Sequence, residues 1–309
     1  MRCDLHVHSW HSGDVDLPVL RHLGRECYSE PGAVYEAARR RGMDLVTLTD
    51  HDSIAGALRL LSLPDTFVSE EVTLWLPGER QLHLGVYDIT ERQHEAIQLR
   101  RRDPEAMFAF LAEERIPACV NHLFSALTGR RALDDVRLPL GRLPLIEALN
   151  GSQPEGHNEY ARLTGRLAGM APVGGSDSHT LAGVARAYTT VPGALTKDDF
   201  LAGLRRGMTV PCGRSGSYAR LTAEVARLFA AGHRDAARGF WRQPARSLAL
   251  VGLLPFLPLM PLFTAGILLH EKVFGTRLHA AFRASTGWPA ETPVRPRPLL
   301  AARTIGEAA

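Results

Sequence analysis

Residues 4–9 read DLHVHS, so two histidines separated by a single valine, His6 and His8, come almost at the start of the chain. Successive side chains of a β-strand point to opposite faces, so these imidazoles share one face while Leu5 and Val7 turn into an apolar layer. Two imidazoles that converge on one point are most simply explained by a metal ion. Alone, the pattern also describes two surface histidines on a strand, and the rest of the chain decides between these interpretations.

The same arrangement recurs downstream, where short apolar runs are each followed by residues able to bind a metal. The runs lead into Asp50-His51-Asp52, Glu70-Glu71, His83, Asn121-His122 and Asp177-Ser178-His179. In barrels of alternating strands and helices, catalytic side chains come from the carboxyl ends of several strands and meet at one mouth. Polar residues that merely cap strands would explain any single case. They explain the set poorly, because His, Asp and Glu recur in it.

The coarse secondary structure agrees with such a fold. Helices are predicted at residues 31–41, 104–114, 157–168 and 197–206, and strands at residues 45–49, 118–120 and 145–149. Pro31 and Pro104 begin the first two helices, and Gly42 and Gly207 follow the first and the last. Repeated strand–helix units of this length indicate parallel strands.

Taken together, these motifs resemble those of PHP-domain metal-dependent phosphoesterases, the relatives of the polymerase-associated domain and of histidinol phosphatase. The motifs are DLHVHS (4–9), TDHDS (49–53), EEVT (70–73) with HLG (83–85), NH (121–122) and GSDSH (175–179), in the family's order over residues 1–215. The resemblance implies a distorted TIM-like (β/α)7 barrel with two or three divalent metal ions, Mn, Zn or Fe. The metal ligands it implies are His6, His8, Asp14, His51, Glu71, His83, His122, Asp177 and His179.

Two positions in this ligand set involve a choice. Glu71 is preferred to Glu70 because the family's bridging glutamate precedes a Val or Ile and then a Ser or Thr, as residues 72 and 73 do here. Asp14 departs from the family's pattern, because the usual Ser-Asp-Gly after the second histidine reads SGD at residues 12–14. His11 is an alternative ligand at this place, or a solvent-exposed loop histidine.

The donor set favours hydrolysis assisted by metal ions. Mixed imidazole and carboxylate ligands suit Mn, Fe or Zn, and the chain lacks the motifs of thiolate-rich zinc sites. A carboxylate such as Glu71 can place one oxygen on each of two ions ~3.5–4 Å apart, the spacing of two-metal hydrolases. Water between such ions loses its proton near neutral pH and attacks phosphorus in line, so no covalent nucleophile from the protein is needed.

Asp50, Asp52 and Arg186 are the candidate catalytic residues beside the ligands. The two aspartates flank His51 and can orient imidazole N–H groups, or they cap the helix that follows; Asp4 is a further candidate for orienting an imidazole. Arg186 follows the last ligands closely, and a guanidinium can hold a substrate phosphate through two hydrogen bonds. A surface ion pair is the alternative for Arg186.

The composition agrees with a globular enzyme. The chain has 309 residues, of which 45% are hydrophobic and 22% charged, enough to bury a substantial core. A formal net charge of +3 argues against a protein that mainly coats nucleic acid. The four cysteines form no CxxC motif, so we expect them to be reduced, as in a cytoplasmic protein.

The character of the chain changes after residue 215. Residues 216–285 are predicted to be helical, and residues 247–269, SLALVGLLPFLPLMPLFTAGILL, contain no charged residue. This stretch meets the ~20 residues that a membrane helix needs, but Pro255, Pro258 and Pro261 also permit a kinked, re-entrant or interfacial segment. A helix pair packed on the barrel or across a dimer is the alternative to membrane association. Residues 286–309 are predicted to be a loose tail.

Charges around the apolar stretch give an expected orientation. Arg234, Arg238, Arg242 and Arg246 precede the stretch, and positive charge tends to stay in the cytoplasm. The N-terminal residues run directly into the first metal motif and show no signal peptide. We therefore expect a cytoplasmic catalytic domain held at a membrane by its C-terminal region, with the oligomeric state left open.

The sequence thus predicts a metal-dependent phosphoesterase that hydrolyses a phosphate mono- or diester. The TDHDS form resembles the branch of nucleotide phosphatases and 5′–3′ exonuclease-like proteins, which implies a nucleotide or short nucleic acid as substrate. An alternative enzymatic function is a phosphatase that acts on a sugar phosphate or an amino-alcohol phosphate. A non-enzymatic alternative is a metal-stabilised regulatory module without activity. The nearly complete ligand set argues against the module.

Overall fold

A computed structural model describes residues 1–14, 24–127, 129, 131–242 and 244–287. The strands are β1 (Arg2–Asp4), β2 (Leu45–Val46), β3 (Ser69–Leu76), β4 (Arg80–Tyr87), β5 (Ala118–Val120), β6 (Leu145–Asn150), β7 (Ala171–Gly175), β8 (Ala187–Thr190) and β9 (Val210–Gly213). The helices before residue 215 are η1 (Trp10–Ser12), α1 (Pro31–Arg40), α2 (Ala55–Leu58), α3 (Glu91–Gln98), α4 (Pro104–Glu113), α5 (Leu133–Arg137), α6 (Glu155–Ala168) and α7 (Lys197–Arg205). Beyond Gly287, the predicted tail lies outside the described residues.

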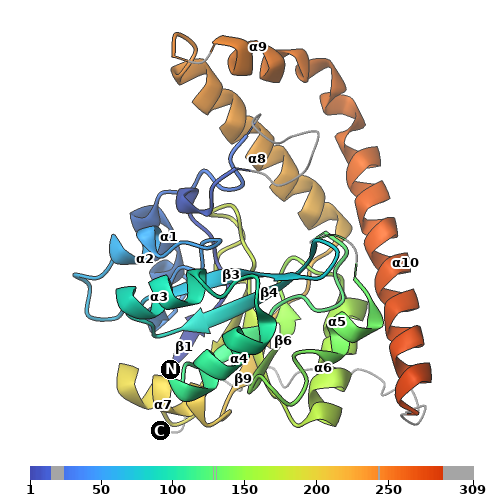
Figure 1. The fold of residues 1–309 in the computed structure, drawn as a ribbon. Helices are drawn as coiled ribbons and strands as arrows, with labels where there is room; N and C mark the ends of the chain where they lie inside the picture. The colour runs from blue at the N-terminus through green and yellow to red at the C-terminus, as the bar shows by residue number, and fades with distance from the viewer. Residues whose placement is uncertain (15–23, 128, 130, 243, 288–309) are drawn as a thin grey trace, which may run out of the picture.

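The strands form two sheets, with the orders β2-β1-β8-β9 and β3-β4-β5-β6-β7. Isolated bridges connect the sheets to the segments between them, at Val7–Ser178, Val46–Thr66 and His51–Glu71. Helices surround the two sheets in a mixed α/β fold (Figure 1). The described strands do not close into a barrel, so the (β/α)7 geometry stays a prediction in its details.

The expectation of parallel strands is correct for only part of the fold. β1 is parallel to β2, and β5, β6 and β7 are parallel to one another, whereas β4 is antiparallel to both β3 and β5, and β8 to both β1 and β9. Only residues 77–79 separate β3 from β4, and Gly78 and Glu79 have φ angles of 79° and 55° there. So short a connection is a hairpin turn, which leaves no room for a crossover helix.

The side chains under the first motif form part of a continuous core. Leu5 and Val7 are each 1% exposed, and they lie just after the end of β1, whereas the sequence predicted a strand through the two histidines. Leu5 packs in a cluster with Phe200 and Leu204 of α7, while Val7 belongs to the larger cluster that includes Val34 of α1. The apolar packing of Leu5 and Val7 in these two clusters therefore fixes the segment that carries His6 and His8.

The C-terminal helices form what we call the C-terminal arm: α8 (Tyr218–Arg238), α9 (Pro244–Gly252), η2 (Leu254–Leu259) and α10 (Met260–Thr286). In Figure 1, α8 runs away from the sheets, α9 lies across the far end, and α10 returns along α5 and α6. The apolar stretch 247–269 is thus divided among three helical segments. Pro255 and Pro261 lie at the starts of η2 and α10, and Pro258 lies inside η2. Proline lacks the N–H that a continuous helix requires.

Within the described residues, one helical span is long and apolar enough to cross a membrane. It runs from Leu257 to Thr286, and 11% of its most apolar window is buried. Length and composition are the only grounds for this candidate, which is weak evidence for a span.

Candidate metal centre

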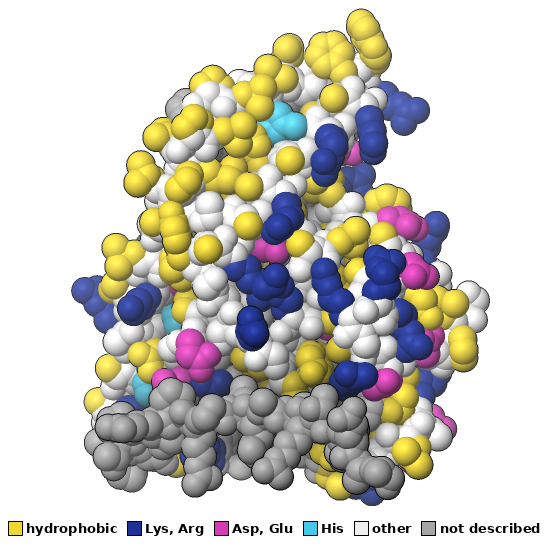
Figure 2. Space-filling model, turned by 180° about the vertical axis from the view of Figure 1, so that it is seen from behind, with side chains coloured by type: hydrophobic (Ala, Val, Ile, Leu, Met, Phe, Trp, Pro, Cys, Tyr) yellow, Lys and Arg dark blue, Asp and Glu magenta, His cyan; other side chains and the backbone are white. Residues whose placement is uncertain are grey.

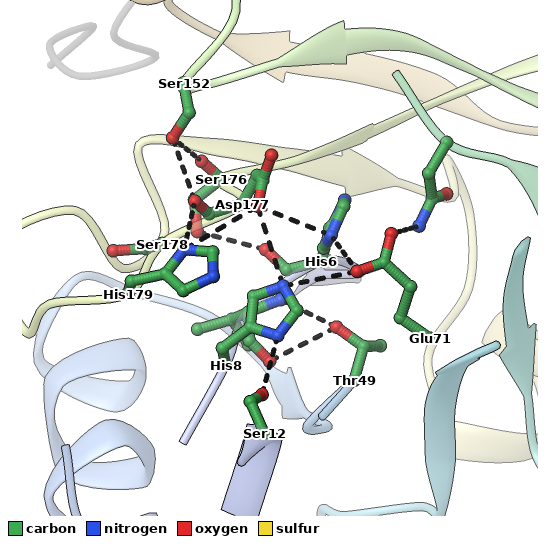
Figure 3. Close-up of polar contacts among 12 residues, drawn as sticks. His6, His8, Ser12, Thr49, Glu71, Ser152, Ser176, Asp177, Ser178 and His179 are labelled. Atoms are coloured by element: carbon green, nitrogen blue, oxygen red, sulfur yellow. Dashed lines mark hydrogen bonds and ion pairs between the residues drawn. The ribbon is translucent and has the colours of Figure 1, made fainter. Parts of the chain in front are cut away.

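His6 and His8 follow β1 directly, and backbone hydrogen bonds fix the segment between them. Asp177 N donates to the His6 carbonyl at 2.7 Å, and His8 N donates to the Ser178 carbonyl at 3.1 Å. The ring centroids of His6 and His8 lie 5.1 Å apart, and both rings face the cluster drawn in Figure 3. Nε2 of each ring lies 3.5 Å from Oδ1 of Asp177. The first and last motifs of the sequence therefore meet at one place.

Glu71, the third residue of β3, lies at the centre of this cluster and is fully buried. Its carboxylate oxygens lie 3.1–3.5 Å from ring nitrogens of five histidines: His6, His8, His51, His83 and His122. Asn121 Nδ2 donates to Oε1 of Glu71 at 2.8 Å. One carboxylate among five imidazoles is the arrangement expected of a bridging metal ligand.

Glu70, the neighbouring residue, points to the opposite face of β3. Its oxygens lie 2.9 Å from Nδ1 of His94 and 2.8 Å from Nε2 of Gln98, both on α3. Alternation along the strand therefore places Glu71 in the cluster and Glu70 outside it.

The least buried side of the cluster contains a carboxylate that the sequence analysis missed. The His8 ring stacks on those of His179 and His51, with centroids 4.3 and 4.8 Å away. Glu26 Oε1 lies 3.3 Å from Nε2 of both His51 and His179. Glu26 belongs to a loop without an apolar run or an alternating pattern, so its sequence gave no signal of this position.

Asp14 lies outside the donor groups of the cluster. It is exposed and forms an isolated bridge with Arg25, and it belongs to none of the metal-competent groups of the described residues. His11, the alternative, is also outside these groups. A role for either residue in metal binding stays a prediction.

The described donors form four overlapping groups, in each of which the donor atoms lie within 4.8 Å of one another. The groups are His8/His51/His179, His6/His8/Asp177, His6/Glu71/His122 and His51/Glu71/His83. Several donor atoms are buried yet lack a hydrogen-bond partner: Nε2 of His6, His8 and His179, Nδ1 of His83 and Oε2 of Glu71. Buried polar atoms normally find partners, so their convergence fits bound cations. The nitrogen and oxygen donors suit Mn, Fe or Zn.

Glu147, on β6, supports three groups of the cluster at once. Its Oε1 lies 2.7 Å from Nδ1 of His6, and its Oε2 accepts from the His122 backbone N–H and from Nδ2 of Asn150, both at 2.9 Å. Asn150 also donates to Oδ2 of Asp177 at 3.0 Å. With Nδ1 of His6 held by a carboxylate, Nε2 is left to face the cluster. A lone charged residue within an apolar strand was the available signal for Glu147.

Asp50 reaches the cluster through Ser12. It accepts from Ser9 N at 2.6 Å and from Ser12 Oγ at 2.9 Å. Ser12 Oγ in turn lies 2.9 Å from Nδ1 of His8. Asp50 is therefore placed to orient His8 indirectly, through the Ser12 hydroxyl.

Asp52 and Asp4 hold backbone rather than imidazoles. Asp52 accepts from Thr73 N at 2.7 Å and pairs with Arg101 at 2.6 Å. Asp4 accepts from the backbone N–H groups of Ser176 and Ala185 at 2.8 and 2.7 Å. Both carboxylates fix segments that carry cluster residues.

Arg186 is exposed on the loop that follows His179. Burial and the neighbouring charge of Arg186 lower the pKa of Arg220 to about 10, so these two guanidinium groups lie near each other. Contact between Arg186 and a substrate phosphate stays a prediction.

Three non-glycine residues at or beside the cluster have a strained backbone. Asp52, His122 and Asp177 have φ angles of 53°, 28° and 49°, in the left-handed region that side chains other than glycine rarely adopt. Such conformations cost about 1–3 kcal/mol each and persist where surrounding contacts hold them, typically at functional sites. Gly175 is required for a related reason, because a Cβ there would lie 2.2 Å from Cβ of His6.

The ionisable groups of the cluster have shifted pKa values that favour the binding of cations. Burial by itself raises the pKa values of Glu71 and Asp177, but the surrounding histidines hold both well below the usual range. Burial, together with neighbouring His179, lowers the pKa of His8 to about 3. Burial opposes protonation of His51, but Glu26 and Glu71 raise its pKa to about 10. Protons on such histidines balance the carboxylates, and bound metal ions would replace them.

The C-terminal arm contacts the loop that carries His122. Glu271 of α10 is buried, and it accepts from Ser125 Oγ at 2.7 Å and from Ala126 N at 2.9 Å. Ser125 N donates to the His122 carbonyl at 2.9 Å. The return of α10 along the domain therefore stabilises one edge of the cluster.

Comparisons with known proteins found one matching family model and several similar folds. Residues 155–209 match the family model described as PHP-associated. The fold resembles that of PsfC from Pseudomonas syringae, with a TM-score of 0.51 and 15% identity over 74% of this chain and 97% of that one. No curated protein matches the sequence.

Two further solved structures are more distant. A protein described as a metal-dependent phosphoesterase from Bifidobacterium adolescentis has a TM-score of 0.45 and 15% identity, over 66% of this chain and 96% of that one. The lesion-specific endonuclease PfuEndoQ from Pyrococcus furiosus has a TM-score of 0.44 and 14% identity, over 66% of this chain and 56% of that one. The PHP-associated match at residues 155–209, which include Asp177 and His179, agrees with the resemblance drawn from the motifs.

Proposed function

We propose that the protein is a metal-dependent phosphoesterase that binds two or three divalent ions, Mn, Zn or Fe, and hydrolyses a phosphate mono- or diester. The observation that carries the proposal is the set of four overlapping donor groups, two of which share Glu71. A regulatory module that had lost hydrolysis would be expected to lose donors, and here buried, unpartnered donor atoms remain.

Different residues of the chain would bind the metal ions, orient the ligands and exclude water. The histidines, with Glu71, Asp177 and Glu26, would hold the ions, and Glu147 would keep Nε2 of His6 directed at the cluster. Bound divalent ions supply activation of a water nucleophile and neutralisation of charge on the phosphoryl oxygens. Asp50, through Ser12, would orient His8, and the buried walls would exclude bulk water.

Hydrolysis of p-nitrophenyl phosphate and of its bis-ester, with Mn²⁺ added to metal-free protein, tests the proposal. We expect metal-dependent turnover of one of these esters by the wild type, and its loss in His8→Ala. His94→Ala is the matched control, because His94 is also paired with a buried carboxylate but lies outside the cluster. Absence of metal-dependent turnover of both esters, or equal loss in both variants, would refute the proposal.

For the location of the protein, we propose that the end of the C-terminal arm rests in a membrane surface, with the metal centre in the cytoplasm. The support is an unusual exposure of apolar side chains there: Trp241, Leu248, Val251, Leu259, Leu262 and Phe263. Figure 2 shows hydrophobic side chains gathered over this end, with Lys and Arg side chains beside them. No acidic residue occurs between Asp235 and Glu271, whereas Arg238 and Arg242 are exposed, which suits anionic headgroups.

The length of α10 before Glu271 favours attachment over spanning. From Met260 to His270 it is about 17 Å long at 1.5 Å per residue, short of a hydrocarbon core of ~30 Å. Within this part, Tyr218 and Thr222 of α8 also contact Pro261 and Thr264. The residue after His270, Glu271, is tied to Ser125 inside the domain. A full span would have to break this contact.

Sedimentation with vesicles of phosphatidylglycerol and phosphatidylcholine tests this attachment. We expect the wild type to bind and Leu262→Asp/Phe263→Asp to remain in solution. Leu99, at the end of α3, is even more exposed than Leu262 and Phe263 but lies outside the C-terminal arm, so Leu99→Asp is the control and should bind as the wild type does. No binding by the wild type would refute the attachment, as would a dimer in solution that the double substitution dissociates.

A further inference from the structure

Two adjoining cavities lie between the loop of residues 25–28 and the outer half of α8, the half nearer to α9 (Figure 1). Their volumes are about 260 and 370 Å³, and the larger one is within the ~300–1,000 Å³ of small-ligand pockets. Arg25, Asp235 and Arg238 line both cavities. We call the two together the basic cavity.

The lining of the basic cavity is rich in guanidinium groups. Arg234 lines its larger part and Arg242 its smaller part, in addition to Arg25 and Arg238. All four arginines are exposed, and Asp235 is the single acidic residue of the lining. Guanidinium groups hold phosphate oxygens through paired, charge-assisted hydrogen bonds. The lining therefore fits a ligand that carries a phosphate group.

Contacts between the surrounding elements fix the walls of the cavity. The Tyr28 hydroxyl accepts from Arg25 N at 3.0 Å. The same hydroxyl would lie 3.0 Å from a Cβ at Gly232, so the loop approaches α8 closely. On the other side, the buried Ser247 donates to the Ala236 carbonyl at 2.9 Å, which holds α9 against α8. Three elements that contact one another thus enclose the cavity.

Exposed apolar side chains flank the basic cavity and distinguish a lipid from a soluble phosphate. Trp241 directly precedes Arg242 and is 91% exposed, and Leu248 directly follows Ser247 and is 59% exposed. A soluble ligand would leave these side chains in water. At a membrane surface, apolar side chains enter the boundary between headgroups and acyl chains, while basic side chains bind anionic headgroups. The surroundings therefore favour a phospholipid.

We propose that the basic cavity binds the phosphate of an anionic phospholipid headgroup through Arg234 and Arg238, while the neighbouring apolar side chains enter the membrane surface. The inference rests on the proposed attachment of the C-terminal arm and deepens it, because it names the class of lipid and the site that recognises it. It does not depend on hydrolysis at the metal centre.

Calorimetric titration of the full-length protein with dihexanoyl phosphatidylglycerol, below the concentration at which this short-chain lipid forms micelles, tests the inference. We expect saturable binding by the wild type. Arg234→Ala/Arg238→Ala should weaken it by about 10–100-fold, because two charge-assisted contacts are lost. Arg227→Ala/Arg277→Ala is the matched control, which removes the same charge from exposed positions of the arm outside the cavity and should bind as the wild type does.

Two results of this titration would overturn the inference. One is equal binding of the lipid by the wild type and the Arg234→Ala/Arg238→Ala variant. The other is binding of inorganic phosphate as tight as that of the lipid, which would make the cavity a site for free phosphate. Dihexanoyl phosphatidylcholine, which has no net charge, should bind more weakly than the anionic lipid, and equal affinity for the two lipids would also contradict the inference.

Vesicle sedimentation separates the inference from the proposed attachment. Leu262→Asp/Phe263→Asp should lose binding to vesicles but keep wild-type affinity for the soluble lipid, because neither residue lines the cavity. Loss of soluble-lipid binding in this variant would overturn the assignment of the headgroup to the cavity. A wild type that binds the soluble lipid through the arginines but does not sediment with vesicles would refute the attachment and keep the headgroup site.

Discussion

Replacement of Glu71 by glutamine changes one charge at the centre of the cluster and leaves the shape of the side chain. Glu71 is shared by two donor groups, one with His6 and His122 and one with His51 and His83. Two unit charges about 4 Å apart interact by about 4 kcal/mol at an effective dielectric constant of ~20. Loss of the carboxylate charge should therefore weaken metal-dependent turnover by about a thousandfold, since 1.36 kcal/mol is tenfold.

The matched control is Glu70→Gln on the same strand. Glu70 is as fully buried as Glu71, but its partners are His94 and Gln98 on α3. We would load both variants with Mn²⁺, dialyse them, and measure the metal content per chain together with turnover of the aryl phosphate ester. Glu71→Gln should lose metal and activity, and Glu70→Gln should keep both. Wild-type metal content in Glu71→Gln, or an equal loss in both variants, would refute the reasoning.

Three further predictions follow from other contacts of the cluster and the arm. Glu147→Gln should lower kcat/KM about 10–100-fold by releasing Nδ1 of His6, as is usual for groups that orient a ligand; wild-type kinetics would count against this role. Glu26→Gln should weaken binding of one metal ion about 10–100-fold, while Asp14→Asn leaves metal titrations unchanged, and the reverse outcome would restore Asp14 as the ligand. Burial, with a smaller effect of a nearby arginine, lowers the pKa of His279 from 6.5 to about 4. The unfolded chain takes up this proton first, so the stability that neutral His279 contributes is complete above pH 6.5 and is lost as the pH falls toward 4. His279→Phe should therefore flatten the decline of the Tm of the metal-free protein over that range, and an unchanged decline would contradict the assignment.

The sequence indicated the cluster well where donors follow strands. The first motif predicted His6 and His8 side by side, and both lie in one donor group with Asp177; His51 and His122 lie in groups that overlap it. A local pattern can express donors of this kind, which lie within a few residues of the end of a strand.

The remaining features depend mainly on contacts between segments that are distant in the sequence. Glu26 reaches the cluster from an irregular loop, and Glu147 reaches it from within an apolar strand. The antiparallel pairing of β3 and β4 follows from a turn too short for a helix, which the expectation of repeated strand–helix units overlooked. The division of residues 247–269 into separate helices follows from prolines whose effect depends on how α10 packs on the domain.

The most direct test of the account is anomalous scattering from crystals of the full chain soaked in Mn²⁺. The account predicts anomalous peaks enclosed by the donor atoms of the cluster, one of them in contact with the carboxylate of Glu71. Peaks only at other places on the molecule, or none after soaking at millimolar metal, would contradict the claim that these side chains form a metal centre.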